Sequence, residues 1–541
     1  MEAHDKQTRN NEHNKGLSVW HLTMLALGTV VGGSFFLGSS VAIRAAGPSV
    51  LLAYILGGIL VYFILSALSE MTVGRPAAGS FRSYAEQAFG QGAGFIVGWV
   101  YWSGLVLAMS SEATAASILL QGWYPGISLP LVGALIIITV TLLNLLGAKR
   151  LSQLESGLAA VKLAAIAGFV VVAGILVAVT FSGQQRPLGI DELVHGAWLP
   201  GGIRGIAGSM LMVMFTYAGF EVLGLAASET TRPDVIVPKA IRYTLITLVS
   251  LYLLAMISLF MLMPPQRISE HISPFVSALQ TYGLGWAGTV MNIVLVSAIL
   301  STMLASVFGL GRMLRSLAEE GHTPAWMKDR SDIPYRGILI SGSGMLAALG
   351  FGLLLPQSVY LFLVSSGGFA LLFSYVMMLL SHYRLRIRNK GPLAASQPMR
   401  GFPYTSWLAI AGLLVIIVSM PLIPGQGGGL VAGLSFIALF TAIHLSRGLL
   451  KRRQLTVNSS LEAREPRRRL HGSGAAPSYV PASAELAEEL TPVQQVESER
   501  NRHKVTGEGP RDMDMHHPVT EESDPSGTVK VRQQHEWQNK R

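Results

Sequence analysis

The sequence of 541 residues contains no cysteine, so disulfide bonds and metal or redox centres built on cysteine are excluded. It is also poor in charge, because Asp, Glu, Lys and Arg make up only 13% of the chain while hydrophobic residues make up 50%. A phosphate-binding loop of the form G-x-x-x-x-G-K-[ST] is missing, which argues against a pump driven by nucleotide hydrolysis. No nucleophile–base pair or metal-ligand set stands out, so we expect neither an enzyme nor a bound metal or cofactor.

Long apolar runs are what the sequence has in abundance. A membrane helix needs about 20 apolar residues, because it rises ~1.5 Å per residue across a hydrocarbon core of about 30 Å. We predict an all-α integral membrane protein with about twelve spans in residues 17–450. The spans begin near Val19, Ser49, Phe89, Leu129, Ser156, Ile203, Lys239, Trp286, Arg336, Gln357, Thr405 and Gly429, and the last ends near Leu450. Residues 451–541 are polar and rich in both charge signs, which predicts a mostly disordered tail.

The net charge of +10 raises the question of nucleic-acid binding, but the placement of the positive residues favours a membrane. Lys and Arg gather in every second connection between spans, and such connections lie in the cytoplasm. The other connections contain few positive residues beyond Arg44, Arg186, Arg204 and Arg267. Both the N-terminal segment 1–16 and the tail 451–541 are therefore predicted to be cytoplasmic. The expected partner is the lipid bilayer and not a nucleic acid.

Two of the predicted spans carry glycine at their centres. The first contains "LALGTVVGGSFFLGSS" (Leu25–Ser40), and the sixth contains "FTYAGFEVLGLAASE" (Phe215–Glu229). Glycine weakens a helix, and unwound backbone at membrane depth is tolerated only where it is buried in protein or lines a cavity. Interrupted segments in corresponding positions of two halves are typical of transporters built from an inverted repeat.

Such a pair of breaks offers binding groups for an α-amino acid. The N-terminus of a half-helix presents N–H donors and a positive dipole end to a carboxylate, and exposed carbonyls accept from an ammonium group. The other interpretation is that the glycines let helices pack closely, as the spacing of Gly28 and Gly32 permits. The coincidence of two matched spans favours a binding site.

Four motifs identify a resemblance that extends over roughly residues 17–450. They are "LGTVVGGSFFLGSS…AGP", "AAGSFRSYAEQAFGQGAGFIVGWVYW", "FTYAGFEVLGLAASETTRPDVIVPKAI" and "RMLRSLAEEGHTPAWM". The chain resembles the amino acid permeases of the amino acid–polyamine–organocation superfamily, in particular the bacterial amino acid transporter branch. The resemblance implies a leucine-transporter-like fold of two inverted five-helix repeats plus two helices, with helices 1 and 6 broken, in the bacterial cytoplasmic membrane.

The resemblance also implies which residues bind the substrate. The carboxylate is expected to meet the backbone N–H groups of Gly32, Gly33 and Ser34. The ammonium group is expected to meet carbonyls near Val31, Phe215, Thr216 and Ala218, with the aromatic rings of Tyr217 and Phe220 covering the pocket. This chain departs from the family at Ser34, where glycine is usual, so the size of its pocket is open.

Buried ionisable residues are functional candidates by default. Lys162 lies in the fifth span. In related permeases, a lysine of this span occupies the place where other carriers bind a sodium ion. The resemblance therefore implies that Lys162 carries the coupled proton. Alternatively, Lys162 extends from near the start of its helix to the cytoplasmic interface. Glu112 of the third span and Glu221 beside the sixth-span break each either carry a proton or hold neighbouring backbone. Glu70 and Arg75, at the end of the second span, are expected to pair.

The leading hypothesis is a secondary active transporter that imports an L-amino acid with a proton by alternating access. An amino acid exchanger without net proton coupling and an amino acid sensor on the same fold are the alternatives. The spans hold no dense acidic cluster of the kind that a cationic substrate requires, so a neutral amino acid is expected. Monomer and homodimer are both left open.

Overall fold

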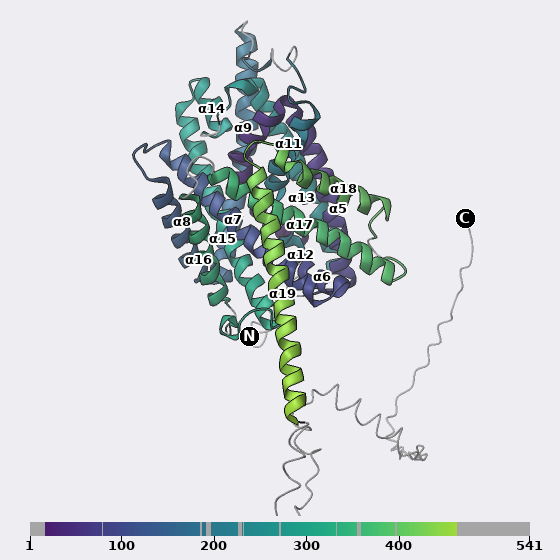
Figure 1. Cartoon of the computed structure of the whole chain (residues 1–541). Coiled ribbons are helices and arrows are strands. Elements are labelled where there is room, and N and C mark those ends of the chain that lie inside the picture. The colour runs from purple at the N-terminus through teal and green to yellow at the C-terminus, as the bar shows by residue number, and fades with distance from the viewer. Residues whose placement is uncertain are drawn as a thin grey trace, which may run out of the picture. The chain divides into compact units, whose positions relative to one another are not determined.

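The computed structural model describes residues 17–77, 79–183, 187–190, 196–225, 230, 232–269, 272–329, 331, 333–353, 359–394 and 398–462. The chain divides into one unit of Met1–Leu455 and a second of Thr456–Arg541, and the second is described only up to Glu462. The first unit holds nearly all of the described helices (Figure 1).

A helix lies at each of the twelve predicted spans, and no strand occurs in the described part of the chain. The spans are α2 (Val19–Val30) with α3 (Gly33–Phe36) and α4 (Gly38–Ala46), α5 (Val50–Gly74), α7 (Gln91–Gln121), α8 (Leu129–Asn144), α9 (Ala148–Ser182), α11 (Gly202–Tyr217) with α12 (Val222–Leu225), α13 (Pro233–Leu262), α15 (Gly285–Glu319), α16 (Tyr335–Leu353), α17 (Val359–Arg388), α18 (Tyr404–Ser419) and α19 (Gly427–Glu462). Two short helices, α6 (Phe81–Phe89) and α14 (Pro274–Thr281), lie between spans. Within the described residues, eight segments are long and apolar enough to cross a membrane, which confirms the predicted all-α membrane fold.

Three helices are longer than their apolar runs. Helix α9 begins at Ala148 instead of near Ser156, and α13 begins at Pro233 instead of near Lys239. Helix α19 continues past Leu450 to Glu462. A helix satisfies its hydrogen bonds internally, so it ends where capping or proline stops it and not where the hydrocarbon stops. Helix α13 begins at Pro233, because proline is favoured in the first turn of a helix, where a backbone N–H would have no partner within the helix.

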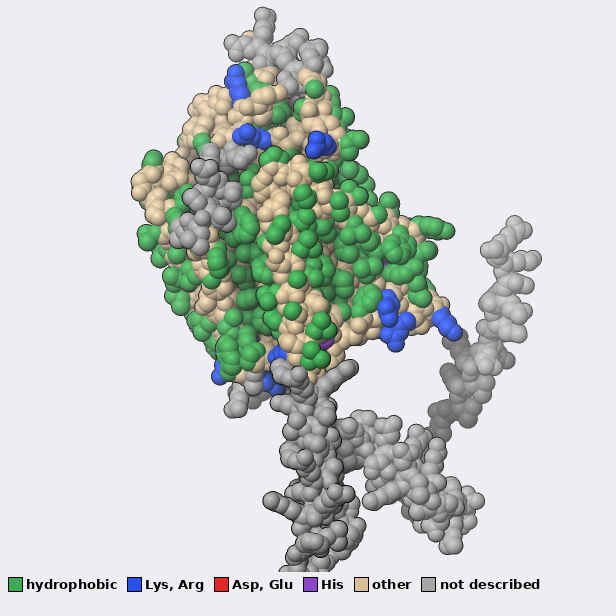
Figure 2. Space-filling model, viewed as in Figure 1, with side chains coloured by type: hydrophobic (Ala, Val, Ile, Leu, Met, Phe, Trp, Pro, Cys, Tyr) green, Lys and Arg blue, Asp and Glu red, His purple; other side chains and the backbone are tan. Residues whose placement is uncertain are grey.

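The broken helices lie at the centre of the packing. Helix α7 packs against α15 and α17, while α11 packs against α4 and α5. In an apolar stretch of 18 residues within Tyr360–Arg388, 83% of the residues are buried in the protein, whereas the share in Gly157–Ser182 is 17% and apolar residues are exposed there. Figure 2 shows hydrophobic side chains over the middle of the visible face, with Lys and Arg towards its ends. This distribution suits a bundle whose middle contacts lipid tails.

Candidate functional site: a cavity between two broken helices

The first span is interrupted as predicted. Helix α2 ends at Val30, and Val31 and Gly32 have extended backbone before α3 begins at Gly33. The φ and ψ angles are −75° and 103° at Val31 and −139° and −168° at Gly32. The break therefore presents carbonyls at the end of one half-helix and N–H groups at the start of the next.

The sixth span is also broken, and the two breaks touch. Helix α11 ends at Tyr217, and Gly219 has φ of 106°, a left-handed conformation that favours glycine. A Cβ on Gly219 would lie 2.8 Å from the carbonyl oxygen of Thr29. The Thr29 hydroxyl lies 3.2 Å from the Gly219 carbonyl oxygen, to which it donates. Position 219 thus requires glycine for two reasons: its φ angle is positive, and the backbone of the first span lies too close for a side chain.

A cavity of about 30 Å³ lies at this junction, with walls from both breaks, α7, α15 and α17. Of the predicted substrate residues, Ser34, Phe215 and Ala218 line it, together with Glu112. The other predicted substrate residues do not line it: Val31, Gly32, Gly33, Thr216 and Phe220. Phe220 instead stacks on Tyr375, with ring centroids 4.9 Å apart. The volume is enough for water and too small for an amino acid. The candidate site is therefore contracted below the size of a substrate.

Glu112 of α7 is bonded to the start of the half-helix. Its carboxylate accepts hydrogen bonds from the backbone N–H of Gly33 (2.9 Å) and of Ser34 (3.0 Å). These are two of the donors that the resemblance assigns to a substrate carboxylate. A negative group is stabilised there by the two N–H donors and by the helix dipole. A substrate carboxylate must share or take over these donors.

Lys162 lies inside the protein and does not extend to the interface. Because α9 begins at Ala148, Lys162 is in the middle of its helix, and its side chain is fully buried. Its ammonium group donates to the carbonyl of Gly28 (2.7 Å) and to the hydroxyl of Thr302 (3.1 Å). The Thr302 hydroxyl lies 3.1 Å from the carbonyl oxygen of Val31. Lys162 thus contacts the last turn before the first break and joins it to α15.

Glu221 faces away from the cavity. Its carboxylate accepts from the hydroxyls of Tyr101 (3.0 Å) and Tyr375 (3.3 Å) and from the N–H of Gly219 (3.1 Å). It ties the sixth-span break to α7 and α17. The Tyr217 hydroxyl donates to the carbonyl of Tyr54 (3.0 Å), so this ring packs against α5 and does not cover the cavity.

Several lining residues were missed by sequence analysis. Helix α7 contributes Leu105, Ala108 and Met109, α15 contributes Thr302 and Ser306, and α17 contributes Leu371. Thr302 and Ser306 are four residues apart, and therefore share a helix face. Two small polar residues on one face of an apolar span are a signal that could have located this wall.

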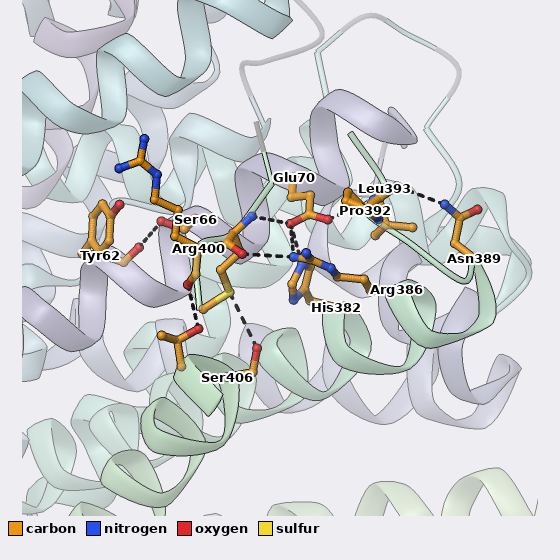
Figure 3. Close-up of polar contacts among 12 residues, drawn as sticks. Tyr62, Ser66, Glu70, His382, Arg386, Asn389, Pro392, Leu393, Arg400 and Ser406 are labelled. Atoms are coloured by element: carbon orange, nitrogen blue, oxygen red, sulfur yellow. Dashed lines mark hydrogen bonds and ion pairs between the residues drawn. The ribbon is translucent and has the colours of Figure 1, made fainter. Parts of the chain in front are cut away.

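A second buried polar cluster lies at the end of α5 (Figure 3). The Glu70 carboxylate accepts from Arg386 (2.9 Å) and from the backbone N–H of Leu393 (2.9 Å) and Met399 (2.7 Å). His382 lies 3.1 Å from the same carboxylate. The predicted pair of Glu70 and Arg75 is wrong, because Arg75 donates to Asn389 (3.2 Å) instead. The cluster fixes the connection after α17 to α5.

Residues 21–462 match the family model described as amino acid permease. The chain belongs to the amino acid permease family. This permease is 34% identical to the amino acid permease YvbW of Bacillus subtilis (strain 168) over 404 residues, which are 74% of the chain and 90% of that protein. It is 32% identical to the gamma-aminobutyric acid permease of Escherichia coli (strain K12) over 428 residues, 78% and 91% of the two chains. The aromatic amino acid transport protein AroP of the same organism is 30% identical over 425 residues, 78% and 92%.

The match confirms the resemblance drawn from the four sequence motifs. Permeases of this family are membrane carriers and not enzymes, and the apolar helices make this chain a multi-pass membrane protein. Amino acid transport is the activity that the family assigns to it.

Proposed function

We propose that this permease is a secondary active transporter that imports a neutral L-amino acid with a proton. Transport proceeds by alternating access to the cavity between the two broken helices. The observation that carries the proposal is the position of Glu112, whose carboxylate is bound by the N–H groups of Gly33 and Ser34. A carboxylate held at this half-helix end is a local analogue of the substrate's own carboxylate.

Substrate binding uses the main chain of both breaks. The substrate carboxylate takes the N–H donors of Gly33 and Ser34, with Gly32 beside them. The ammonium group meets carbonyls of Val31, Phe215, Thr216 and Ala218. Some of these carbonyls already accept within the protein, since Tyr252 donates to Thr216 (3.2 Å). A carbonyl oxygen has two lone pairs, so it can accept from the substrate as well.

The cavity wall favours a neutral side chain. Among the described residues that line the cavity, Glu112 is the one charged group, and it is held by backbone donors. Leu105, Met109 and Leu371 supply apolar contact. A charged substrate side chain would be buried against these residues without a partner, which is costly. Phe220, which stacks on Tyr375, completes the packing next to the sixth-span break.

The proton is carried by Glu112 and Lys162. When the substrate displaces Glu112 from its two N–H donors, the freed carboxylate takes up a proton, because an unpaired buried charge is strongly disfavoured. Lys162 holds the first-span break through Gly28 and Thr302. Release of its proton to water on the cytoplasmic side weakens these contacts and lets the break rearrange. Glu221 acts as a gating residue through Tyr101 and Tyr375.

The proposed location is a bacterial cytoplasmic membrane with both termini in the cytoplasm. The distribution of Lys and Arg between alternate connections supports this orientation. The 1–16 segment and the part of the tail beyond Glu462 lie outside the described residues. A homodimer is compatible with the lipid-facing helices.

The test is uptake into proteoliposomes with labelled amino acids and an imposed pH gradient, alkaline inside. Accumulation of one or a few neutral amino acids that collapses with the gradient supports the proposal. Rapid exchange with preloaded amino acid, without accumulation, identifies an exchanger. Binding without any flux, in folded protein, identifies a sensor.

A further inference from the structure

A fully buried arginine lies on the short helix between the second and third spans. Arg82 of α6 has a side chain with no exposed surface. Its guanidinium bonds to both carboxylate oxygens of Glu320, the residue directly after α15. It also donates to Glu86 (3.3 Å) and to the hydroxyl of Ser316 (3.2 Å). Bidentate arginine–carboxylate pairs are among the strongest charge-assisted contacts.

The surrounding backbone leaves room for this arginine. A Cβ on Gly98 of α7 would lie 2.8 Å from Arg82 Cδ, and a Cβ on Gly79 would lie 2.8 Å from Arg82 Nη2. Side chains at either glycine would displace the guanidinium. The pair of Arg82 with Glu320 is therefore built into the packing of α6, α7 and α15. We call Arg82, Glu86 and Glu320 the inner latch.

The positive charge that holds the two carboxylates of the inner latch together is that of Arg82. Ligand atoms of Glu86, Glu320 and His322 lie within 4.8 Å of one another, as in a metal site. However, Arg82 already bonds to both carboxylates. The cluster therefore joins two helices through a protein cation.

Continuous contacts link the inner latch to the cavity. Phe81, next to Arg82, packs edge-on against Tyr101 with ring centroids 4.7 Å apart. Tyr101 donates to Glu221 (3.0 Å), which accepts from the N–H of Gly219 in the cavity wall (3.1 Å). Opening a path beneath the cavity must separate these groups.

We propose that the inner latch closes the cytoplasmic end of the transport path, and that α6 must part from the end of α15 before substrate is released inside. The proposal rests on the proposed function and its orientation. The Glu320 side chain is 38% exposed while the Arg82 side chain is fully buried, so separating the two leaves a buried guanidinium that water from the Glu320 side must solvate. Arg82 is thus a positioning residue that sets the balance between closed and inward-open states.

The cysteine-free sequence makes the test direct, because one engineered thiol has no background. Ala108→Cys places a thiol in the cavity wall, where Ala108 is 1% exposed. A membrane-impermeant maleimide is applied to one face at a time of oriented vesicles, without substrate or pH gradient. The labelling rate then reports how often the cavity opens to that face.

With Arg82→Gln we expect cytoplasmic-side labelling to rise about tenfold, as when an inward-open population grows from about 1% to about 10%. Labelling from the other face should not rise. Glu320→Gln should act in the same direction, and the reversed pair Arg82→Glu with Glu320→Arg should return the rate towards that of the parent. Arg315→Gln is the matched control, because it removes an ion pair with Glu319 (2.9 Å) on α15 and a hydrogen bond to the Ser331 carbonyl (2.8 Å), both outside the latch.

Unchanged cytoplasmic labelling in folded Arg82→Gln and Glu320→Gln proteins would overturn the latch. An equal rise from both faces would also overturn it, since that indicates loosened packing. Labelling needs neither substrate nor a proton gradient. A failure of uptake would therefore contradict the proposed function without changing the outcome of the labelling experiment on the latch.

Discussion

The carboxylate of Glu112 lies 2.9 Å from the backbone nitrogen of Gly33, and the fit between these two residues depends on glycine. A Cβ on residue 33 would lie 2.5 Å from the same carboxylate oxygen and 2.7 Å from Ile299 Cγ1. The acid and the glycine thus occupy adjoining space at the start of the half-helix. A group that takes the place of the Glu112 carboxylate must be small and must accept hydrogen bonds, as the carboxylate of an amino acid does.

Glu112→Gln should lower gradient-driven uptake by at least about tenfold, the effect of about 1.4 kcal/mol. The amide cannot bind or release a proton, and it has only one oxygen to accept from the two N–H donors. Uptake into proteoliposomes measures the effect, and substrate-induced thermal shift shows whether binding survives. Parental accumulation in this variant would exclude Glu112 from proton coupling.

Gly33→Val should abolish substrate binding. The added side chain collides with Glu112 and Ile299, so the acid leaves its donors and the half-helix end is blocked. Gly174→Val is the matched control, because a Cβ at Gly174 on α9 meets open space. Equilibrium binding of labelled substrate compares the two. Equal affinities would mean that the first-span glycines serve helix packing alone.

Lys162→Ala should abolish proton-driven accumulation while exchange persists. The substitution also removes the donor to Gly28 and Thr302, at a cost of about 1–3 kcal/mol for buried groups left unpaired. Lys239→Ala, at an exposed position on α13, controls for loss of a lysine. Accumulation and exchange are measured in the same vesicles, with and without a gradient. Full accumulation by the variant would rule out Lys162 as the proton carrier.

Acidification should destabilise the protein through His322, which follows the last turn of α15. Burial, and then the nearby positive charge of Arg82, lower the pKa of His322 below its usual 6.5, while Glu320 opposes them and Arg447 and His444 add to them. The folded state therefore favours the neutral ring. The stability that this contributes is present above pH 6.5 and is lost as the pH falls through the lowered pKa.

Thermal unfolding in detergent between pH 7 and pH 5 measures this loss. The parent should lose more stability over that window than His322→Gln, which has no ring to protonate. Burial and the neighbouring Glu320 raise the pKa of Glu86, so Glu86 acts with the opposite sign, losing stability as the pH rises. Glu86 is present in both proteins, so the difference between them reports on His322 and on its contact with Glu320. Parallel curves would contradict the prediction.

The two breaks are predictable from the sequence because glycine is a local signal. The contact of Gly219 with Thr29 is not predictable in this way, since it joins residues 190 positions apart. The partners of Glu70 show the same limit. Arg75 is near in sequence, but Arg386 is brought to Glu70 by the packing of α17 against α5. The inner latch was missed for that reason, although Arg82 and Glu320 both stand inside recognisable motifs.

The sequence by itself determined the membrane helices and the family, because apolar length and local motifs are properties of short segments. Only the tertiary structure decided that Lys162 is buried between α2 and α15, that Glu112 occupies the half-helix end, and that Glu221 turns away from the cavity. Those outcomes depend on which helix faces meet. A buried charge takes its partner from whatever neighbouring backbone or side chain the packing provides, and no single span encodes that choice.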